Sequence, residues 1–129
     1  MSRRDRGAVG PRGAPEPPAR ARARATIDRQ ATLFAALGER TRLHLVRVLC
    51  AGGALSVTDL TAGTALTRQA VTKHLQVLAD AGLVRDVKVG RERRWRFEAA
   101  RLAEARRALE AYGARWDRAL ERLKASLER

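Results

Sequence analysis

The chain has 129 residues, which suits a single domain with one modest hydrophobic core. Hydrophobic residues make up 45% of the chain and aromatic residues only 4%, so the core must be built mostly from Leu, Val and Ala, a composition that favours helices. Lys and Arg total 27 against 14 Asp and Glu, and the net charge of +13 predicts a polyanionic partner such as nucleic acid. The alternative is a coding bias toward Arg and Ala that raises the charge without a function.

Cysteine content and hydropathy exclude two classes of protein. Cys50 is the only cysteine, so a disulfide framework within the chain is impossible, and this fits a reducing cytoplasm. No apolar run approaches the roughly 20 residues that span a bilayer, and no apolar segment follows the first basic residues as in a secretory signal. We therefore expect a cytoplasmic chain without a membrane partner, in which Cys50 packs as a small hydrophobic residue.

Residues 1–25 are predicted to form a disordered basic arm. Four prolines and three glycines interrupt regular structure there, and seven arginines face only two acidic residues. Such an arm adds non-specific contacts to phosphates, or it is a dispensable extension. The folded domain is expected over residues 26–129.

Helical spacing and capping residues predict four consecutive helices after the arm. Gly38 ends the first helix and Gly52 the second. Ser56 and Asp59 resemble a capping box at the start of the third helix, and Thr67 caps the fourth. The expected ranges are 26–38, 40–53, 56–64 and 67–80.

The pattern changes after residue 82. Val87 and Val89 alternate with polar residues, as do Trp95 and Phe97, which predicts a β-hairpin with its tip at residues 90–93. From about residue 100 to 129 the apolar residues return to alternating steps of three and four, typical of a long helix with a helix–helix seam. The predicted fold is mainly α with a small β-hairpin, in the order α-α-α-α-β-β-α, which is a winged helix-turn-helix.

The fourth helix has two distinct faces. Val71, Leu75 and Leu78 form an apolar stripe for docking on the preceding helix. In a helix-turn-helix unit the opposite side of the first turns enters the major groove, where Arg pairs with guanine and Gln with adenine. The alternative is the ordinary polar face of a surface helix. The residues expected to contact DNA are Thr67, Arg68, Gln69, Thr72 and Lys73.

Basic residues cluster on or beside the tip of the predicted hairpin. A basic wing lies along the phosphate backbone or inserts an arginine into the minor groove. The alternative is a solvated hairpin whose charges protect its edges. The wing residues expected to contact DNA are Lys88, Arg91, Arg93 and Arg94, with Arg96 beside them.

Together these motifs resemble the ArsR-type winged-helix transcriptional regulators. The similarity runs from about residue 27 to the C-terminus, and Thr72 stands where the family pattern has Ser. The resemblance implies a homodimer joined through the first and last helices, which binds an inverted-repeat operator, usually as a repressor. The long last helix with Trp116 is similar to the SdpR-like autorepressor subgroup. The segments that carry the resemblance are "LGERTRLHLVRVL", "LSVTDL", "LTRQAVTKHLQVLADAGLV" and "GRERRWRF".

Many members of this family sense metals, but the residues of their metal sites are missing here. Ser56 and Thr58 stand where one family site has two cysteines, and hydroxyls are poor ligands for soft cations. The last helix, which carries another family site, has no histidine. His44 and His74 lack converging ligands, so we expect no metal and no cofactor, and we expect His74 to support its helix. Neither a phosphate-binding loop nor a nucleophile–base pair is evident, which argues against an enzyme.

The last helix carries more apolar residues than one small domain covers. Burying them against a symmetry mate suits a two-fold dimer, whereas the alternative is that the helix folds back on its own domain. The resemblance adds the first helix to this interface. The expected dimer residues are Leu33, Leu102, Leu109, Tyr112, Trp116 and Leu123.

The sequence therefore predicts a homodimeric, sequence-specific DNA-binding repressor, with its own promoter as a candidate target. The alternatives are a non-specific architectural protein driven by charge, and a winged-helix module for protein contact. The sequence names no small-molecule effector.

Overall fold

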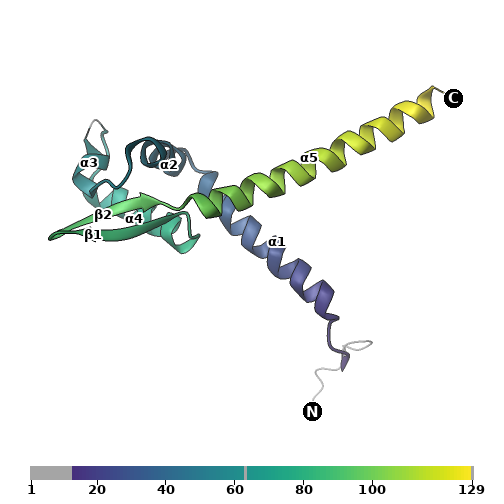
Figure 1. Cartoon of the computed structure of the whole chain (residues 1–129), viewed down its shortest axis with the longest axis horizontal. Coiled ribbons are helices and arrows are strands. Elements are labelled where there is room, and N and C mark those ends of the chain that lie inside the picture. The colour runs from purple at the N-terminus through teal and green to yellow at the C-terminus, as the bar shows by residue number, and fades with distance from the viewer. Residues whose placement is uncertain (1–12, 63, 129) are drawn as a thin grey trace, which may run out of the picture.

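The computed structural model describes residues 13–62 and 64–128, which form five helices and one antiparallel hairpin (Figure 1). The predicted fold class and order of elements are confirmed. In chain order the elements are α1 (Pro18–Leu37), α2 (Arg40–Gly52), α3 (Val57–Thr61), α4 (Arg68–Asp80), β1 (Val84–Val89), β2 (Glu92–Phe97) and α5 (Ala99–Leu127).

Helix α1 begins eight residues earlier than the sequence pattern predicts. Pro18 occupies the start of the helix, where its missing N–H group costs nothing, and residues 19–25 alternate between Ala and Arg, both strong helix formers. Arg24 also pairs with Glu16, just before the helix, with Nη1 and Oε2 2.6 Å apart. The expected end of the arm at residue 25 is therefore wrong, because residues 18–25 are helical. Residues 1–12 of the expected arm lie outside the described residues.

A reciprocal capping box starts the short helix α3, as predicted. The Ser56 hydroxyl accepts a hydrogen bond from the backbone N–H of Asp59 at 3.0 Å, and the Asp59 carboxylate accepts one from the backbone N–H of Ser56 at 3.1 Å. The bond from the Ser56 backbone, with a smaller contribution from its hydroxyl, lowers the pKa of the Asp59 carboxyl. The carboxylate therefore stays ionised at the positive end of α3, where negative charge is favourable.

Residues in the sequence at both ends of α4 cap the helix. Thr67 caps the start, because its hydroxyl accepts a hydrogen bond from the backbone N–H of Ala70 at 3.0 Å. At the end, Gly82 adopts a φ of 80°, in the left-handed region that favours glycine. The backbone N–H of Leu83 then donates to the carbonyl of Leu78 at 2.9 Å, which is the Schellman arrangement. Both ends agree with the sequence prediction.

The apolar stripe of α4 lies at the centre of the core. Val71, Leu75 and Leu78 are all 0% exposed. Their burial against α1, α2 and the hairpin fixes the rotation of α4 about its own axis. The core side chains that surround the stripe include Leu33, Leu45, Val46, Leu49, Leu60, Leu83, Val84 and Trp95.

The hairpin is tighter than the sequence predicts. Strands β1 and β2 pair antiparallel with Val89 opposite Glu92, so the turn consists of Gly90 and Arg91 alone. Gly90 has a φ of 66°. The two-residue turns that match the twist of a hairpin require a positive φ at their first residue.

A backbone bridge ties the hairpin to the connection between α2 and α3. Leu55 and Trp95 exchange two backbone hydrogen bonds, of 2.9 and 2.7 Å. The Trp95 side chain beside this bridge is 2% exposed. Because α3 and α4 follow Leu55 directly, this bridge helps to set where the hairpin lies relative to the helix-turn-helix.

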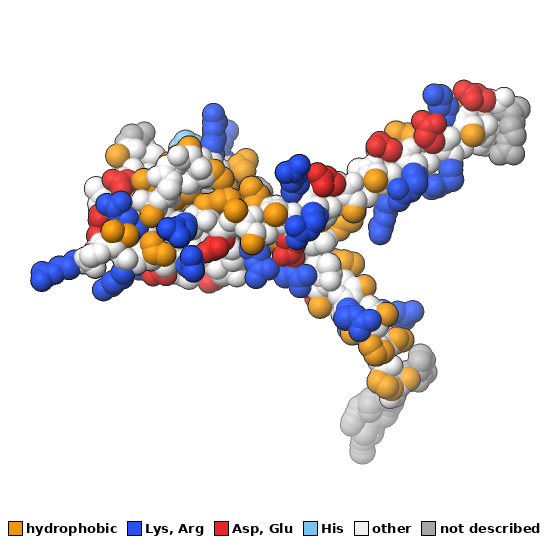
Figure 2. All heavy atoms as spheres, viewed as in Figure 1, with side chains coloured by type: hydrophobic (Ala, Val, Ile, Leu, Met, Phe, Trp, Pro, Cys, Tyr) orange, Lys and Arg blue, Asp and Glu red, His pale blue; other side chains and the backbone are white. Residues whose placement is uncertain are grey.

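Helices α1 and α5 both extend away from the body formed by α2, α3, α4 and the hairpin (Figures 1 and 2). Near the body they are joined by an ion pair between Arg29 and Glu104 at 2.5 Å and by a hydrogen bond from the Tyr112 hydroxyl to Gln30 at 2.5 Å. The bond from Arg29, with a second from Arg101, lowers the pKa of the Glu104 carboxyl, so this link is ionic. The far half of α5 runs beyond these contacts.

Truncating the docking stripe should destabilise the fold. We expect Leu75→Ala to lower the free energy of unfolding by about 2–5 kcal/mol, because it leaves a cavity in the core. Urea unfolding followed by circular dichroism measures this loss. Val77→Ala is the matched control on the same helix, since Val77 is 41% exposed, and it should cost less than about 1 kcal/mol. Equal losses for the two variants would contradict the described rotation of α4.

Candidate nucleic-acid interface

The first two turns of α4 gather all five predicted contact residues of this helix on one surface. Four of these side chains are exposed and Thr72 is half-buried, because the opposite face of the helix carries the docked stripe. The residues are Thr67, Arg68, Gln69, Thr72 and Lys73, and all but Arg68 line one shallow depression.

Helix α3 supports the beginning of this surface. The Arg68 guanidinium donates from Nη1 to the Thr58 hydroxyl on α3. Thr58 is one of the two positions at which the resemblance placed a missing metal thiolate, and here its hydroxyl contacts a predicted DNA-reading side chain. The N-terminus of α4 adds positive potential from the helix dipole at the same end. The combined surface is polar, positively charged and exposed.

The tip of the wing presents two of the predicted basic residues to solvent. Lys88 lies near the end of β1 and Arg91 occupies the turn, and both are exposed. Figure 2 shows basic side chains projecting from this end of the molecule.

The other two predicted wing residues are engaged within the protein. Arg93 donates from Nε to Asp86 at 2.9 Å, and its guanidinium lies 4.7 Å from the centre of the Trp95 ring. Arg94 donates to Glu92 at 2.9 Å and to the carbonyl of Ala54 at 3.3 Å, so it braces the hairpin against the connection before α3. Of these two residues, Arg94 is half-buried and braces the hairpin, whereas Arg93 stays exposed and pairs within the hairpin.

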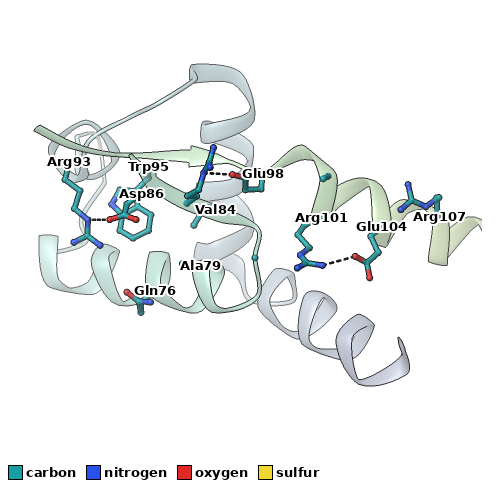
Figure 3. A pocket seen from close by; sticks show the side chains of 13 residues that line it. Gln76, Ala79, Val84, Asp86, Arg93, Trp95, Glu98, Arg101, Glu104 and Arg107 are labelled. Carbon is teal, nitrogen blue, oxygen red and sulfur yellow. Dashed lines mark hydrogen bonds and ion pairs between the residues drawn. The ribbon is translucent and has the colours of Figure 1, made fainter. Parts of the chain in front are cut away.

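A charged groove lies between the hairpin, the end of α4 and the start of α5 (Figure 3). Each of its three carboxylates pairs with an arginine. The pairs are Arg93 with Asp86 at 2.9 Å, Arg85 with Glu98 at 2.7 Å and Arg101 with Glu104 at 3.1 Å. Of these three pairs, the one between Arg85 and Glu98 joins the hairpin to the residue just before α5, and the groove offers no free carboxylate pair for acid–base chemistry.

His74 lies in the joint between α4 and the start of α2. Its Nδ1 is 3.4 Å from Arg42 Nη1 and 3.7 Å from Glu39 Oε1. Over residues 13–62 and 64–128, no three His, Cys, Asp or Glu side chains converge in a way that could hold a metal ion. Sequence reasoning missed the contacts of His74 with Arg42 and Glu39, because no periodicity links residues 32 or 35 positions apart.

The residues expected in a dimer interface lie at or near the surface of α5, except Leu33, which lies in the core. Leu109, Tyr112, Trp116 and Leu123 are exposed, with Trp116 at 66%, and Leu102 is half-buried. The prediction for Leu33 is wrong, because this side chain is 0% exposed and packs in the core of its own protomer. It has no surface left to offer a partner.

The exposed stripe on α5 is wider than predicted. Leu120, between two predicted positions, and Leu127, one turn beyond the last of them, are also exposed. From residue 109 to 127 the exposed apolar positions follow the helical repeat of 3.6 residues, so the stripe runs straight along the helix. This spacing of apolar residues can be read from the sequence, and it predicts the full length of the stripe.

Cys50 is exposed, so the prediction that it packs as a small hydrophobic residue is wrong. It lies seven residues after Leu43, which is also exposed, and both occupy the outer face of α2.

Within the described part of the chain, no helix combines the length and apolar character that would let it cross a membrane.

Comparison with known proteins gives consistent matches. A family described as a helix-turn-helix domain matches residues 37–87. An uncharacterised HTH-type transcriptional regulator, YuzN from Bacillus subtilis, is 39% identical over 67 residues, which cover 47% of this chain and 73% of that protein. An ArsR-like transcriptional regulator from Rhodococcus sp. RHA1 has a similar structure with a TM-score of 0.70 and 41% identity, covering 78% of this chain and 93% of the other.

A more distant structure has the same fold. It is a homodimeric winged helix-turn-helix DNA-binding domain from Mycobacterium bovis, a possible ArsR-family regulator. Its TM-score is 0.58 at 23% identity, and the match covers 84% of this chain and 94% of that domain.

Proposed function

Because the chain belongs to the ArsR-type family of winged helix-turn-helix transcriptional regulators, and is thus a DNA-binding regulator, we propose that it acts as a homodimeric repressor of an inverted-repeat operator. The observation that carries the proposal is the exposed polar surface on the first turns of α4, with a basic wing tip beside it. In this proposal the homodimer binds DNA in the cytoplasm. It catalyses no reaction and requires no metal or cofactor.

Base reading is assigned to Arg68 and Gln69. Arg pairs with the O6 and N7 atoms of guanine and Gln with the N6 and N7 atoms of adenine in the major groove. Both side chains are exposed at the end of α4 that enters a groove in helix-turn-helix proteins. Thr72 and Lys73 are assigned to phosphate or base edges, while the Thr67 hydroxyl is already used as the helix cap.

The homodimer is assigned to α1 and α5. The stripe on α5 continues into an apolar groove between these helices, which Phe34, Leu37, Phe97 and Leu102 line. A second copy covers this surface most economically by a two-fold arrangement. Two α4 helices then reach major grooves about 34–36 Å apart.

Genome-wide footprinting with the purified protein tests the proposal. We expect protection of a small number of inverted repeats that survives an excess of competitor DNA, with one candidate in the promoter of its own gene. Protection spread evenly over any duplex would favour the alternative, a non-specific architectural protein driven by the +13 charge. No binding at low salt would favour a module for protein contact.

The base-reading assignment predicts a loss of specificity. Arg68→Ala or Gln69→Ala should cost about 1–3 kcal/mol on the operator and relax the base preference at one position. Binding titrations on the operator and on single-base variants measure both effects. Gln76→Ala, an exposed residue two turns further along α4, is the control and should change neither. Equal weakening on every sequence would assign these side chains to phosphates instead.

The wing assignment predicts a change in salt dependence. Arg91→Ala should weaken binding to all duplexes and reduce the slope of log affinity against log salt by about one, because one phosphate contact is lost. Arg118→Ala removes the same charge from the exposed far half of α5 and should leave the slope unchanged. If Arg91→Ala also left it unchanged, the wing tip would not reach DNA.

The dimer assignment predicts dissociation when the stripe is truncated. Trp116→Ala should raise the dimer dissociation constant by about 30-fold, as expected for a large aromatic side chain at the centre of an interface. Analytical ultracentrifugation over a concentration series measures this constant, with Arg118→Ala as the control. A wild-type protein that stays monomeric at all concentrations would remove the basis for the assignment.

A further inference from the structure

Three polar side chains meet where α1, α2 and α4 join. Glu39 stands just before α2, Arg42 lies in its first turn, and His74 lies in the middle of α4. The Arg42 side chain is 17% exposed and that of His74 is 24% exposed. We propose that Arg42 is a positioning residue for DNA recognition, which holds the recognition helix α4 in a fixed place relative to the end of α1.

Arg42 closes the C-terminal end of α1. Its Nε donates to the carbonyl of Ala36 at 2.8 Å and its Nη2 to the carbonyl of Ala35 at 3.4 Å. The last carbonyls of a helix lack partners within the helix and carry partial negative charge. Helix α1 has no basic residue in its own last turn, so the guanidinium of the next helix supplies the positive charge there.

The third nitrogen of the same guanidinium contacts α4. Arg42 Nη1 lies 3.4 Å from Nδ1 of His74, which accepts the bond when its proton is on Nε2. His74 directly follows Lys73 and Thr72, which belong to the predicted DNA-contacting surface. One planar side chain therefore contacts the end of one helix and the middle of another.

The Glu39 carboxylate lies beside the guanidinium and caps the backbone of Arg42. Its Oε1 accepts a hydrogen bond from the backbone N–H of Arg42 at 2.9 Å and lies 4.0 Å from Arg42 Nη1. The backbone hydrogen bond is the largest cause of the lowered pKa of the Glu39 carboxyl. The carboxylate thus remains ionised at neutral pH and balances the charge of Arg42.

The link that Arg42 makes between α1 and α4 is important because α1 belongs to the proposed dimer interface and α4 to the proposed DNA-binding surface. Helix α1 is joined to α5 through Arg29 and Glu104, and we assign both helices to the dimer. The reading surface of α4 must then keep a fixed distance and angle to that of the partner. The inference rests on the proposed function in this one respect.

Binding measurements on three variants test the role. Arg42→Met removes the donors at similar length, Arg42→Lys keeps the charge without the planar fork, and Arg47→Met is the control at an exposed arginine of the same helix. Both Arg42 variants should lower the ratio of operator affinity to affinity for non-specific duplex by about tenfold, with unchanged non-specific binding and salt slope. An unchanged ratio, or an equal loss on both duplexes, would overturn the proposal.

Substitutions at His74 separate positioning from simple stabilisation. His74→Gln keeps a hydrogen-bond acceptor and should retain the ratio, whereas His74→Phe keeps a ring without an acceptor and should lower it. The double variant Arg42→Met with His74→Phe should be no worse than Arg42→Met alone, since Arg42→Met already removes the contact with His74. Fully additive losses would contradict a direct link between these side chains.

Hydrogen exchange of the free protein gives a readout that does not depend on DNA. In Arg42→Met, the amides of the last turn of α1 and of residues 71–80 should exchange about tenfold faster, while those of the hairpin keep their rates. Uniform acceleration in every element, or no change in α4, would overturn the inference. If the wild type shows no specific DNA binding but this local pattern appears, the proposed function fails while the coupling of α1 to α4 stands.

Discussion

The structure depends on the burial of one apolar stripe on α4. Val71, Leu75 and Leu78 are fully excluded from water, and rotating the helix would expose them at a cost of about 1.5–3 kcal/mol each. The polar residues of the first two turns are therefore forced outward onto one surface. The same packing places α3 in front of α4 and the wing beside it, so the candidate DNA interface is a consequence of how the core is built.

Backbone hydrogen bonds and ion pairs then set the positions around this core. The bridge between Leu55 and Trp95 joins the wing to the connection before α3. The pairing of Arg29 with Glu104 joins α1 to α5. Arginines of the same chain thus have different roles: Arg29 and Arg94 brace elements against one another, whereas Arg68 and Arg91 stay exposed.

Local signals predicted most of the fold and which residues share the exposed surface at the start of α4. The capping residues Ser56 and Thr67, and the apolar spacing of α4, act within a few residues and can be read directly from the sequence. Errors arose where tertiary contacts decide. An apolar residue such as Leu33 can face either its own core or a partner, and spacing alone does not distinguish them. The start of α1 differs from the prediction because Pro18 fits the first position of a helix and the Ala–Arg repeat after it favours a helix, although the prolines before it indicate irregular structure.

The most direct test of the account changes the spacing within an operator identified by footprinting. Inserting about five base pairs between the two half-sites turns one of them to the opposite face of the duplex, whereas inserting about ten restores the same face. If a rigid dimer presents two α4 helices to successive major grooves, the first insertion should reduce affinity to nearly that of a single half-site, and the second should recover part of the loss. Equal affinity for all three duplexes would contradict the paired reading of two half-sites.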